Sequence, residues 1–437
     1  MISCSFLVIG GGETGINTAL KLAKFSSEVI LAEENEIGGS WLYSLEYPFY
    51  CWSKEINSTN LQSKTQEISQ INEKIQQKLD QKQTEIIDNL QKQKVKIVYG
   101  KANFLSKSMV EVNSENEHEI ITFKHAIVCT GKNQINMPEL SGIEEIDFLY
   151  QHNIFAIKEI PTSLAIIDCS IFSLEIAYLY ANLGCKVHIF EAGNIRQILR
   201  FFDSTCLNWT FQELLKKNIS FHFETKISKV INQNNQVKLF DNNKNSFLID
   251  KIFIFAEESF DGEKIALPKI GIKFDKKGVI TTQNGQTIQR NIYTIGNSAQ
   301  NYKKENLYST INNLCQTFCP IEEKKTNSIV LFGSNSEKNN LEIHKINLSE
   351  PIFSLGMSYR AAETRWGAVI QFEIYKSLFD SGFAKITYNS VNGQILGIGL
   401  TGIIAQDFHS VCINFLSKNT NHKEVRNFFL NNKLYLE

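Results

Sequence analysis

The chain has 437 residues, a hydrophobic fraction of 43%, a charged fraction of 21% and a formal net charge of -1. This hydrophobic content excludes a mainly disordered chain, and the length suffices for about three domains of roughly 150 residues each. The near-neutral charge argues against nucleic acid and against an anionic membrane surface as partners.

The amino terminus and the cysteines indicate in which cellular compartment the protein is found. The sequence enters the apolar run FLVIGGG almost at once, with no basic segment and no stretch long enough for a signal peptide or a membrane span. Its nine cysteines are scattered singly, which is typical of a reducing compartment. We therefore expect a cytoplasmic protein without a metal site, in which Cys315 and Cys319 are core thiols.

The beginning of the chain predicts one β-α-β unit. Apolar residues 6–9 and 29–32 suit buried parallel strands, and residues 14–24 have the apolar spacing of a helix. The turn between the first strand and the helix is rich in glycine. In units of this kind the ligand binds at the carboxyl ends of the strands.

The glycine turn predicts a dinucleotide site. Gly10, Gly12 and Gly15 have the spacing that permits a tight turn, close approach of backbone amides to a pyrophosphate, and close packing of the helix on the strand. Glu33 ends the next strand, where a carboxylate accepts hydrogen bonds from ribose hydroxyls. The alternative is a glycine turn that binds no ligand.

Residues 59–94 predict a long amphipathic helix. The segment is rich in Gln, Lys and Glu, and its apolar residues recur at spacings typical of one helix face. These residues are Leu61, Ile68, Ile71, Ile75, Leu79, Ile86 and Leu90. We expect this face to pack on its own domain, and a coiled coil with a partner is the alternative. Residues 94–113 and 118–132 then predict strands that return to the first sheet.

A second β-α-β unit follows at residues 163–193 and repeats the pattern of the first. The three glycines and the acid of the first unit fall opposite Asp168, Ser170, Ser173 and Glu191. The architecture is therefore repeated, whereas the chemistry of the second turn is not.

The remaining sequence predicts a closing strand and a separate carboxyl-terminal domain. The segment RNIYTIGNS near residue 290 is typical of a strand that completes the first sheet. From Pro351 onward, two strands joined by an Asn-Gly turn and two helices, 403–418 and 422–430, indicate an α+β domain.

These elements resemble the flavoprotein disulfide reductases, the class I pyridine nucleotide-disulfide oxidoreductases, and among them the dihydrolipoamide dehydrogenases. The resemblance covers nearly the whole chain. It implies an α/β fold with two Rossmann-like domains for FAD and NAD(P), one inserted in the other, and a carboxyl-terminal α+β dimerisation domain. The implied boundaries are 1–150 for the first part of the FAD domain, 151–260 for the NAD-type domain, 261–318 for the return segment of the FAD domain, 319–346 for a linker or insertion and 347–437 for the dimerisation domain.

The resemblance also assigns an FAD site. CTG at residues 129–131 corresponds to the family's ATG strand end, and TIGN at residues 294–297 corresponds to its A-x-G-D signature. An amide in the position of that Asp still bonds a ribityl hydroxyl. The implied FAD-binding residues are Gly10, Gly12, Gly15, Glu33, Gly39, Ser40, Lys54, Thr130, Gly131, Gly296 and Asn297.

Three candidate catalytic residues follow from the same resemblance. In that family a Lys shortly after the redox cysteines pairs with a Glu beside the flavin N5, and CWSK and SLE supply Lys54 and Glu175 in these positions. Cys51 corresponds to the thiol that contacts the flavin, although filling of the core is the equal alternative. Trp41 occupies the position of the thiol that attacks a substrate disulfide, and indole has no such nucleophile.

The second turn and the tail also depart from the family. Asp168 places a carboxylate near the expected pyrophosphate, and Glu257 and Glu258 stand where the family has Gly-Arg, so NAD(P) binding is doubtful. At the carboxyl end, Asn432 falls on the family's acid-base His, while Glu437 matches the Glu that orients it. Asn does not titrate and cannot shuttle a proton.

Two functions are compatible with this sequence. The first is an FAD-dependent oxidoreductase that has lost the redox disulfide, is not a competent dihydrolipoyl dehydrogenase, and has an unidentified small-molecule redox partner. The second is a non-catalytic flavoprotein that serves as a scaffold or partner subunit, in a homodimer or in a heterodimer with a paralogue. A flavin monooxygenase is disfavoured, because that family needs a glycine-rich NADPH turn and lacks this carboxyl-terminal domain.

Overall fold

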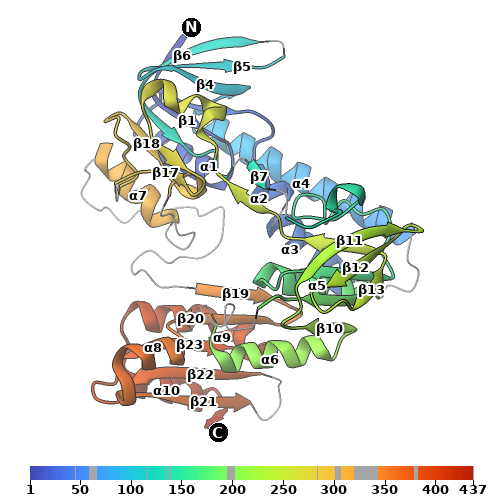
Figure 1. Ribbon diagram of the computed structural model, residues 1–437. Coiled ribbons are helices and arrows are strands. Elements are labelled where there is room, and N and C mark those ends of the chain that lie inside the picture. Colours follow the sequence, from blue (N-terminus) through green and yellow to red (C-terminus); the bar gives the residue numbers. More distant parts are fainter. Residues whose placement is uncertain are drawn as a thin grey trace.

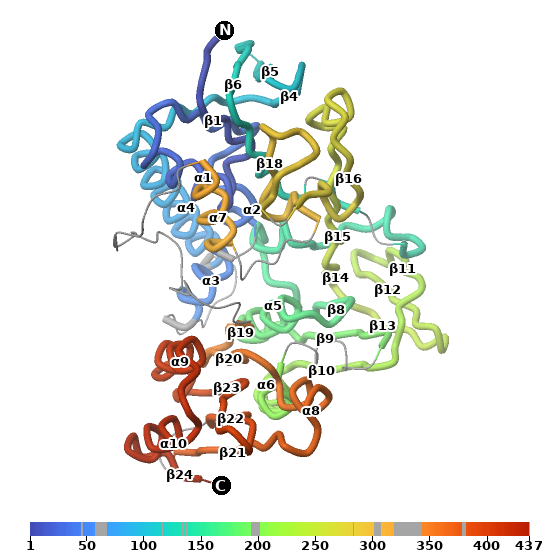
Figure 2. The backbone as a smooth tube through the Cα atoms, turned by 90° about the vertical axis from the view of Figure 1, so that its left-hand side faces the viewer, coloured from blue at the N-terminus to red at the C-terminus, as the bar shows by residue number. Residues whose placement is uncertain are grey.

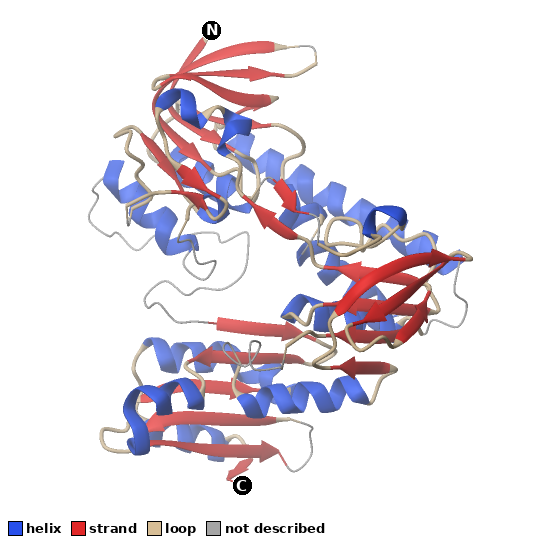
Figure 3. Cartoon of the chain, in the orientation of Figure 1, coloured by secondary structure: helices blue, strands red, loops and turns tan. Residues whose placement is uncertain are grey.

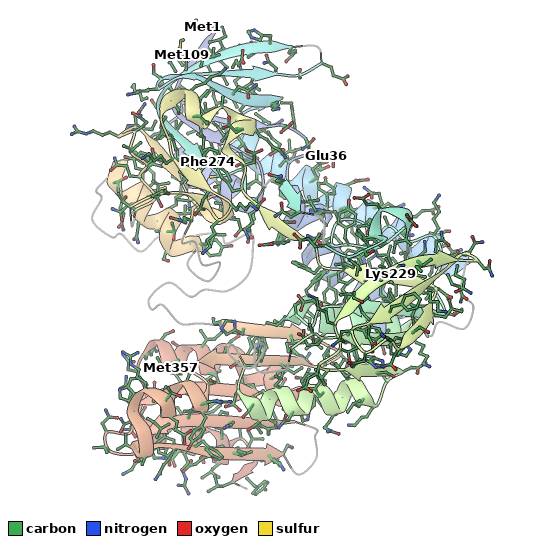
Figure 4. The ribbon with its side chains drawn as sticks, in the orientation of Figure 1. Met1, Glu36, Met109, Lys229, Phe274 and Met357 are labelled. Carbon is green, nitrogen blue, oxygen red and sulfur yellow. The ribbon has the colours of Figure 1, made fainter. Side chains whose placement is uncertain are left out.

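The computed structural model describes residues 1–437 apart from 45, 59–65, 116, 133, 137–138, 194–201, 283, 301–306, 319–342, 378–381 and 437; the side chains of residues 46, 57, 58, 66 and 67 are likewise not described. Three sheet-containing parts follow one another along a curved molecule, with the amino terminus at one end and the carboxyl terminus at the other (Figure 1, Figure 3). In Figure 4, Glu36 and Phe274 mark the first part, Lys229 the second and Met357 the third.

A seven-stranded sheet forms the first part. Its strands are β1 (Ile2–Ile9), β2 (Val29–Glu33), β3 (Lys96–Tyr99), β4 (Lys101–Ser106), β5 (Met109–Asn113), β6 (His118–Val128) and β18 (Ile292–Thr294). Neighbouring strands are parallel from β3 through β2, β1 and β6 to β18, and β5 and β4 extend β6 as an antiparallel edge. The predicted closing strand near residue 290 is confirmed as β18, while the domain boundaries stay predictions.

Helices cover this sheet and bury their apolar faces against it. They are α1 (Glu13–Ala23), α2 (Gly39–Tyr43), α3 (Glu46–Ser58), α4 (Gln66–Lys92) and α7 (Leu307–Phe318). The apolar face of α4, from Ile68 to Leu90, belongs to the same hydrophobic core as Val8 of β1 and Leu31 of β2. This confirms that the long helix packs on its own chain; Leu61, assigned to the same face, lies outside the described residues.

The second part repeats the nucleotide-binding pattern with a four-stranded parallel sheet in the order β10-β9-β8-β14. Its elements are β8 (Ser163–Ile167), α5 (Ile171–Asn182), β9 (Lys186–Phe190), α6 (Ser204–Leu215), β10 (Ile219–His222) and β14 (Lys251–Ile254). An antiparallel sheet of β11 (Ile227–Gln233), β12 (Gln236–Asp241) and β13 (Ser246–Ile249) packs beside it. The second predicted β-α-β unit is therefore confirmed.

A two-stranded ladder connects the first two parts. β7 (Gln134–Asn136) carries the chain out of the first part, and β15 (Glu257–Ser259) brings it back antiparallel to β7. The return segment then contains β16 (Phe274–Asp275), β17 (Gly278–Val279) and β18. Short 3-10 turns are η1 (Ile143–Glu145), η3 (Gly262–Ile265), η4 (Leu267–Ile270), η5 (Gly296–Ser298) and, in the third part, η7 (Gly367–Val369).

The third part is a six-stranded sheet in the order β19-β20-β23-β22-β21-β24. Its elements are β19 (Ile343–Asn347), β20 (Pro351–Gly356), α8 (Tyr359–Trp366), β21 (Ile370–Ser377), β22 (Phe383–Asn389), β23 (Ile395–Leu400), α9 (Gly402–Ser417), α10 (His422–Asn431) and β24 (Leu434–Leu436). The two predicted strands with the Asn-Gly turn are β22 and β23, and the two predicted helices are α9 and α10.

A buried ion pair joins the second part to the third. Lys385 of β22 donates to both carboxylate oxygens of Asp203 at 2.9 Å, just before α6, and to Thr205 Oγ1 at 3.1 Å. The rings of Phe372 and Tyr359 lie 4.5 and 5.4 Å from the ammonium. In both views α6 accordingly lies beside the carboxyl-terminal sheet (Figure 1, Figure 2).

Candidate functional site

A cavity of about 770 Å³ opens at the carboxyl ends of the first sheet. It is lined by residues that follow β1, β2, β3, β6 and β18, and by the start of α2. Because the amino end of α1 faces the same space, its free backbone N–H groups and its dipole favour an anion there. The position is the one at which open α/β sheets bind nucleotides.

The glycine turn shapes one wall of this cavity. A Cβ on Gly10 would lie 2.6 Å from the carbonyl oxygen of Cys129, and a Cβ on Gly15 would lie 1.7 Å from that of Gly10. Close packing of the backbone therefore leaves no room for a side chain at either position. Gly12 differs, because no atom lies within 4 Å of the point where its Cβ would stand. It precedes the first residue of α1 and supplies no side-chain cap, so the amides of that helix end stay open toward the cavity.

Polar groups line the cavity on both sides of the turn. Glu33 accepts from the backbone amides of Gly11 and Asn35, and burial raises the pKa of its carboxyl although these hydrogen bonds oppose the effect. On the β6 side, Thr130 Oγ1 is buried and has no hydrogen-bond partner among the described residues. An orphaned hydroxyl in a cavity wall indicates a ligand that supplies the missing partner. These groups fit FAD.

Most of the predicted FAD-binding residues meet at this cavity. The lining includes Gly10, Gly12, Glu33, Gly39, Ser40, Thr130, Gly131 and Asn297. Gly15 packs behind the turn, and Gly296 packs against Thr14, whose Oγ1 would lie 2.6 Å from an added Cβ. Sequence reasoning did not single out three lysines of the lining, Lys101, Lys132 and Lys264. The signal for Lys101 was its place after a parallel strand, since β3 ends at the same edge of the sheet.

The predicted pair of Lys54 and Glu175 does not form. Lys54 is exposed on α3 and donates to Tyr50 Oη at 3.3 Å. Glu175 is buried on α5, where one carboxylate oxygen accepts from the backbone amide and the Nδ2 of Asn347, each at 2.7 Å. Both residues are described, and no ion pair joins them. Neither lines the cavity. The prediction is corrected because α3 turns Lys54 outward, whereas Glu175 faces the first strand of the carboxyl-terminal sheet.

Cys51 lies in the hydrophobic core instead of the cavity lining. It is 2% exposed, and burial raises the pKa of its thiol. A raised pKa keeps the sulfur protonated and unreactive. The eight described cysteines are all buried, and no disulfide joins any two of them. Cys315 is among them, while Cys319 lies outside the described residues.

We expect Glu175 to make the stability of the protein depend on pH. Burial raises the pKa of its carboxyl from 4.5 to about 7, despite the two hydrogen bonds from Asn347. The folded chain holds this proton more tightly than the unfolded chain does. The free energy of unfolding should therefore fall as the pH rises from 4.5 to above 7, by about 3 kcal/mol in total. Glu175→Gln keeps an oxygen for both donors and never ionises.

The variant should therefore match the wild type near pH 4.5, the ordinary pKa of this carboxyl, and unfold at higher urea concentration well above pH 7. Exposed Glu139→Gln provides the matched control, since it removes a charge without changing a buried site. A stabilisation of equal size at both pH values would contradict the role assigned to ionisation.

The second turn is built differently from the first. Asp168, opposite Gly10, has a φ of +81° and faces Glu191, and the pKa of its carboxyl is raised by burial and by that neighbouring carboxylate. Glu191 accepts from the amides of Cys169 at 3.0 Å and Gly193 at 2.7 Å. Two carboxyl groups thus stand beside the second turn, whereas glycines form the first.

Ser170 closes the amino end of α5. Its hydroxyl oxygen accepts from the backbone N–H of Ser173 at 3.1 Å, so the helix end that would face a phosphate is capped by its own side chain. The corresponding residue of the first unit, Gly12, makes no such bond. The two turns therefore share a fold but not an open helix end.

The structure also shows the surroundings of Glu257, Glu258 and Asn432, the other residues that differ from the family pattern. Glu257 is exposed, while Glu258 is partly buried and hydrogen-bonded to His152 and Gln151. Burial alone would raise the pKa of the Glu258 carboxyl, but these hydrogen bonds outweigh burial, and the pKa is lowered. Asn432 ends α10 and donates through Nδ2 to a carbonyl of the same helix. Glu437 lies outside the described residues.

The fold and the cavity define a nucleotide-binding flavoprotein class, and the sequence comparisons agree. Residues 5–314 match the family described as pyridine nucleotide-disulphide oxidoreductase, and the chain belongs to this family. The dihydrolipoyl dehydrogenase of Bacillus subtilis (strain 168) is 24% identical over 437 residues, covering 94% of this chain and 89% of that protein. The mercuric reductase of Staphylococcus aureus is 23% identical over 306 residues, covering 66% of this chain and 55% of that protein.

Solved structures show the same fold. The HOCl-induced flavoprotein disulfide reductase RclA from Escherichia coli has a TM-score of 0.82 at 17% identity, covering 97% of this chain and 95% of that one. LpdA from Mycobacterium tuberculosis has a TM-score of 0.79 at 13% identity, covering 95% of this chain and 94% of that one. The predicted family resemblance and fold class are both confirmed.

In the described part of the chain, no helix is long and apolar enough to cross a membrane. In the same residues, no group of three or more His, Cys, Asp and Glu side chains is arranged to hold a metal ion.

Proposed function

We propose that this protein binds FAD at the cavity of the first sheet and does not carry out dithiol-disulfide exchange. The observation that supports FAD most directly is the cavity. It combines an open helix end after Gly12, the Glu33 carboxylate in the position that binds a ribose, and the buried Thr130 hydroxyl that has no hydrogen-bond partner among the described residues. The amides after Gly12 would hold the pyrophosphate, Glu33 a ribose, and Thr130 and Asn297 the ribityl chain. Bound FAD would supply the redox chemistry.

Two residues support the proposed loss of dithiol-disulfide exchange. Trp41 lines the cavity where the attacking thiol is expected, and Cys51 is a core thiol with a raised pKa. A thiol relay needs a reactive thiolate, which neither residue supplies. The protein is therefore proposed to be an FAD-dependent oxidoreductase of another kind.

Weak NAD(P) binding is the second element of the proposal. It is supported by the carboxyl groups of Asp168 and Glu191 and by the cap that Ser170 places on α5. We expect the purified protein to be yellow and to bleach slowly, if at all, when NADH or NADPH is added without oxygen. Rapid bleaching by either would contradict weak binding, and a colourless protein that takes up no added FAD would contradict the FAD site.

A non-catalytic partner subunit is the alternative function. It is favoured by large apolar side chains that remain exposed on the carboxyl-terminal sheet and its helices, among them Phe372, Leu430, Tyr435 and Leu436. Such a face would associate with a second copy of the chain or with a paralogue. An FAD-loaded protein with no turnover in any flavin assay, together with a stable dimer, would support this alternative.

A further inference from the structure

Three aromatic rings lie in a row between the cavity and the protein surface. Trp41 lines the cavity, its ring centroid lies 5.4 Å from that of Tyr47, and the Tyr47 ring lies 6.1 Å from that of Tyr50. Tyr50 is 54% exposed. These separations are those of aromatic rings in contact. The aromatic row, Trp41, Tyr47 and Tyr50, thus connects the proposed FAD site with solvent through α2 and the start of α3.

The hydroxyl groups of the row differ in their surroundings. Tyr47 is partly buried next to the thiol of Cys51, and burial raises the pKa of this tyrosine. The Tyr50 oxygen lies 3.3 Å from the Lys54 ammonium at the surface. Tyr50 is therefore the exposed end of the row, where a small soluble donor can reach it.

Indole and phenol are side chains that readily give up a single electron. We propose that the aromatic row carries single electrons from the surface to FAD in the cavity, so that a small soluble donor reduces the light-excited flavin through Tyr50. The inference rests on the proposed FAD site. It assigns a use to the segment in which the family's thiol pair is missing.

The electrons and protons of this step balance. With FAD bound, Trp41 would give one electron to the flavin that has absorbed blue light. Tyr47, which is only partly buried, would return one electron to Trp41 and release its phenolic proton to water. Tyr50 would then return one electron to Tyr47, which takes a proton back from water, and Tyr50 would lose its own phenolic proton to water and remain as a neutral radical. Ascorbate supplies one electron, and solvent one proton, to restore it. The net result is one electron passed from ascorbate to the flavin, with no lasting change in the protein.

The experiment illuminates the FAD-loaded full chain with blue light in the absence of oxygen. Without ascorbate, we expect an electron paramagnetic resonance signal of a tyrosyl radical; with ascorbate, we expect steady bleaching of the flavin absorbance. Tyr50→Phe and Tyr47→Phe keep the rings but remove the hydroxyls, and both should lose the radical signal and the ascorbate-dependent bleaching. Tyr435→Phe removes a comparably exposed tyrosine, 49% accessible, from the distant carboxyl-terminal strand and should behave as the wild type.

The outcomes separate this inference from the proposed function. A chain that takes up no FAD contradicts the proposed function and this inference together. An FAD-loaded chain whose Tyr50→Phe and Tyr47→Phe variants keep the wild-type radical signal and bleaching rate overturns the inference alone. Because the FAD content of each variant is measured first, loss of the cofactor is not mistaken for loss of electron transfer.

Discussion

Gly12→Glu is expected to empty the FAD site while leaving the fold intact. Gly12 has an ordinary φ of -76°, and no atom lies within 4 Å of its Cβ position. The new carboxylate would nevertheless stand beside the pyrophosphate. A like charge at this range costs about 4 kcal/mol near a protein surface, which corresponds to a roughly 1000-fold loss of affinity. Titration of the apoprotein with FAD measures the loss.

Two further glycine variants serve as controls for this result. Gly12→Ala adds a methyl group without a charge and should weaken FAD binding far less than Gly12→Glu. Gly15→Ala forces a Cβ to within 1.7 Å of the Gly10 carbonyl oxygen and should destabilise the fold itself, as seen by thermal unfolding. Normal FAD affinity in Gly12→Glu would exclude the turn as the phosphate site.

Lys385→Met is expected to lower the free energy of unfolding by about 3–5 kcal/mol, because it leaves a buried carboxylate without its partner. Lys385 is 3% exposed and Asp203 is 4% exposed, and two hydrogen bonds of 2.9 Å join them between the second and third parts. Urea unfolding monitored by fluorescence measures the change.

A double variant tests the reason for this loss. Lys385→Met combined with Asp203→Asn removes both buried charges and keeps an oxygen to cap α6, so it should recover part of the stability. Exposed Lys423→Met is the matched control and should stay within about 0.5 kcal/mol of the wild type. Equal losses in Lys385→Met and Lys423→Met would contradict a buried ion pair between the second and third parts.

The parts of the fold that could be predicted depend on local patterns. The glycine turn of the first unit, the apolar face of α4 and the Asn-Gly hairpin each lie within a short stretch of sequence. The glycine motif assigned Glu33 to a nucleotide site, and the family resemblance assigned Thr130 and Asn297 to the same site. They meet there because residues after neighbouring parallel strands share one edge of a sheet. The family resemblance supplied the order of the parts.

The features that could not be predicted depend on the rotation of a helix or on distant contacts. Whether Lys54 faces the cavity or solvent is decided by the rotation of α3 about its own axis, which the sequence around Lys54 does not specify. The partner of Glu175 is Asn347, which lies far along the chain in another sheet. Asp203 and Lys385 are likewise distant in sequence, and no local pattern links two such residues.

The antiparallel pairing of β7 with β15 has a consequence for protein engineering. Asn136 lies opposite Glu257, so the chain enters and leaves the second part at neighbouring points. A segment with adjacent ends can be excised as a cassette and replaced by a short turn. The Asp203–Lys385 and Glu175–Asn347 contacts, however, attach this cassette to the carboxyl-terminal sheet. We therefore expect a chimera to keep these contacts only if it exchanges the second and third parts together.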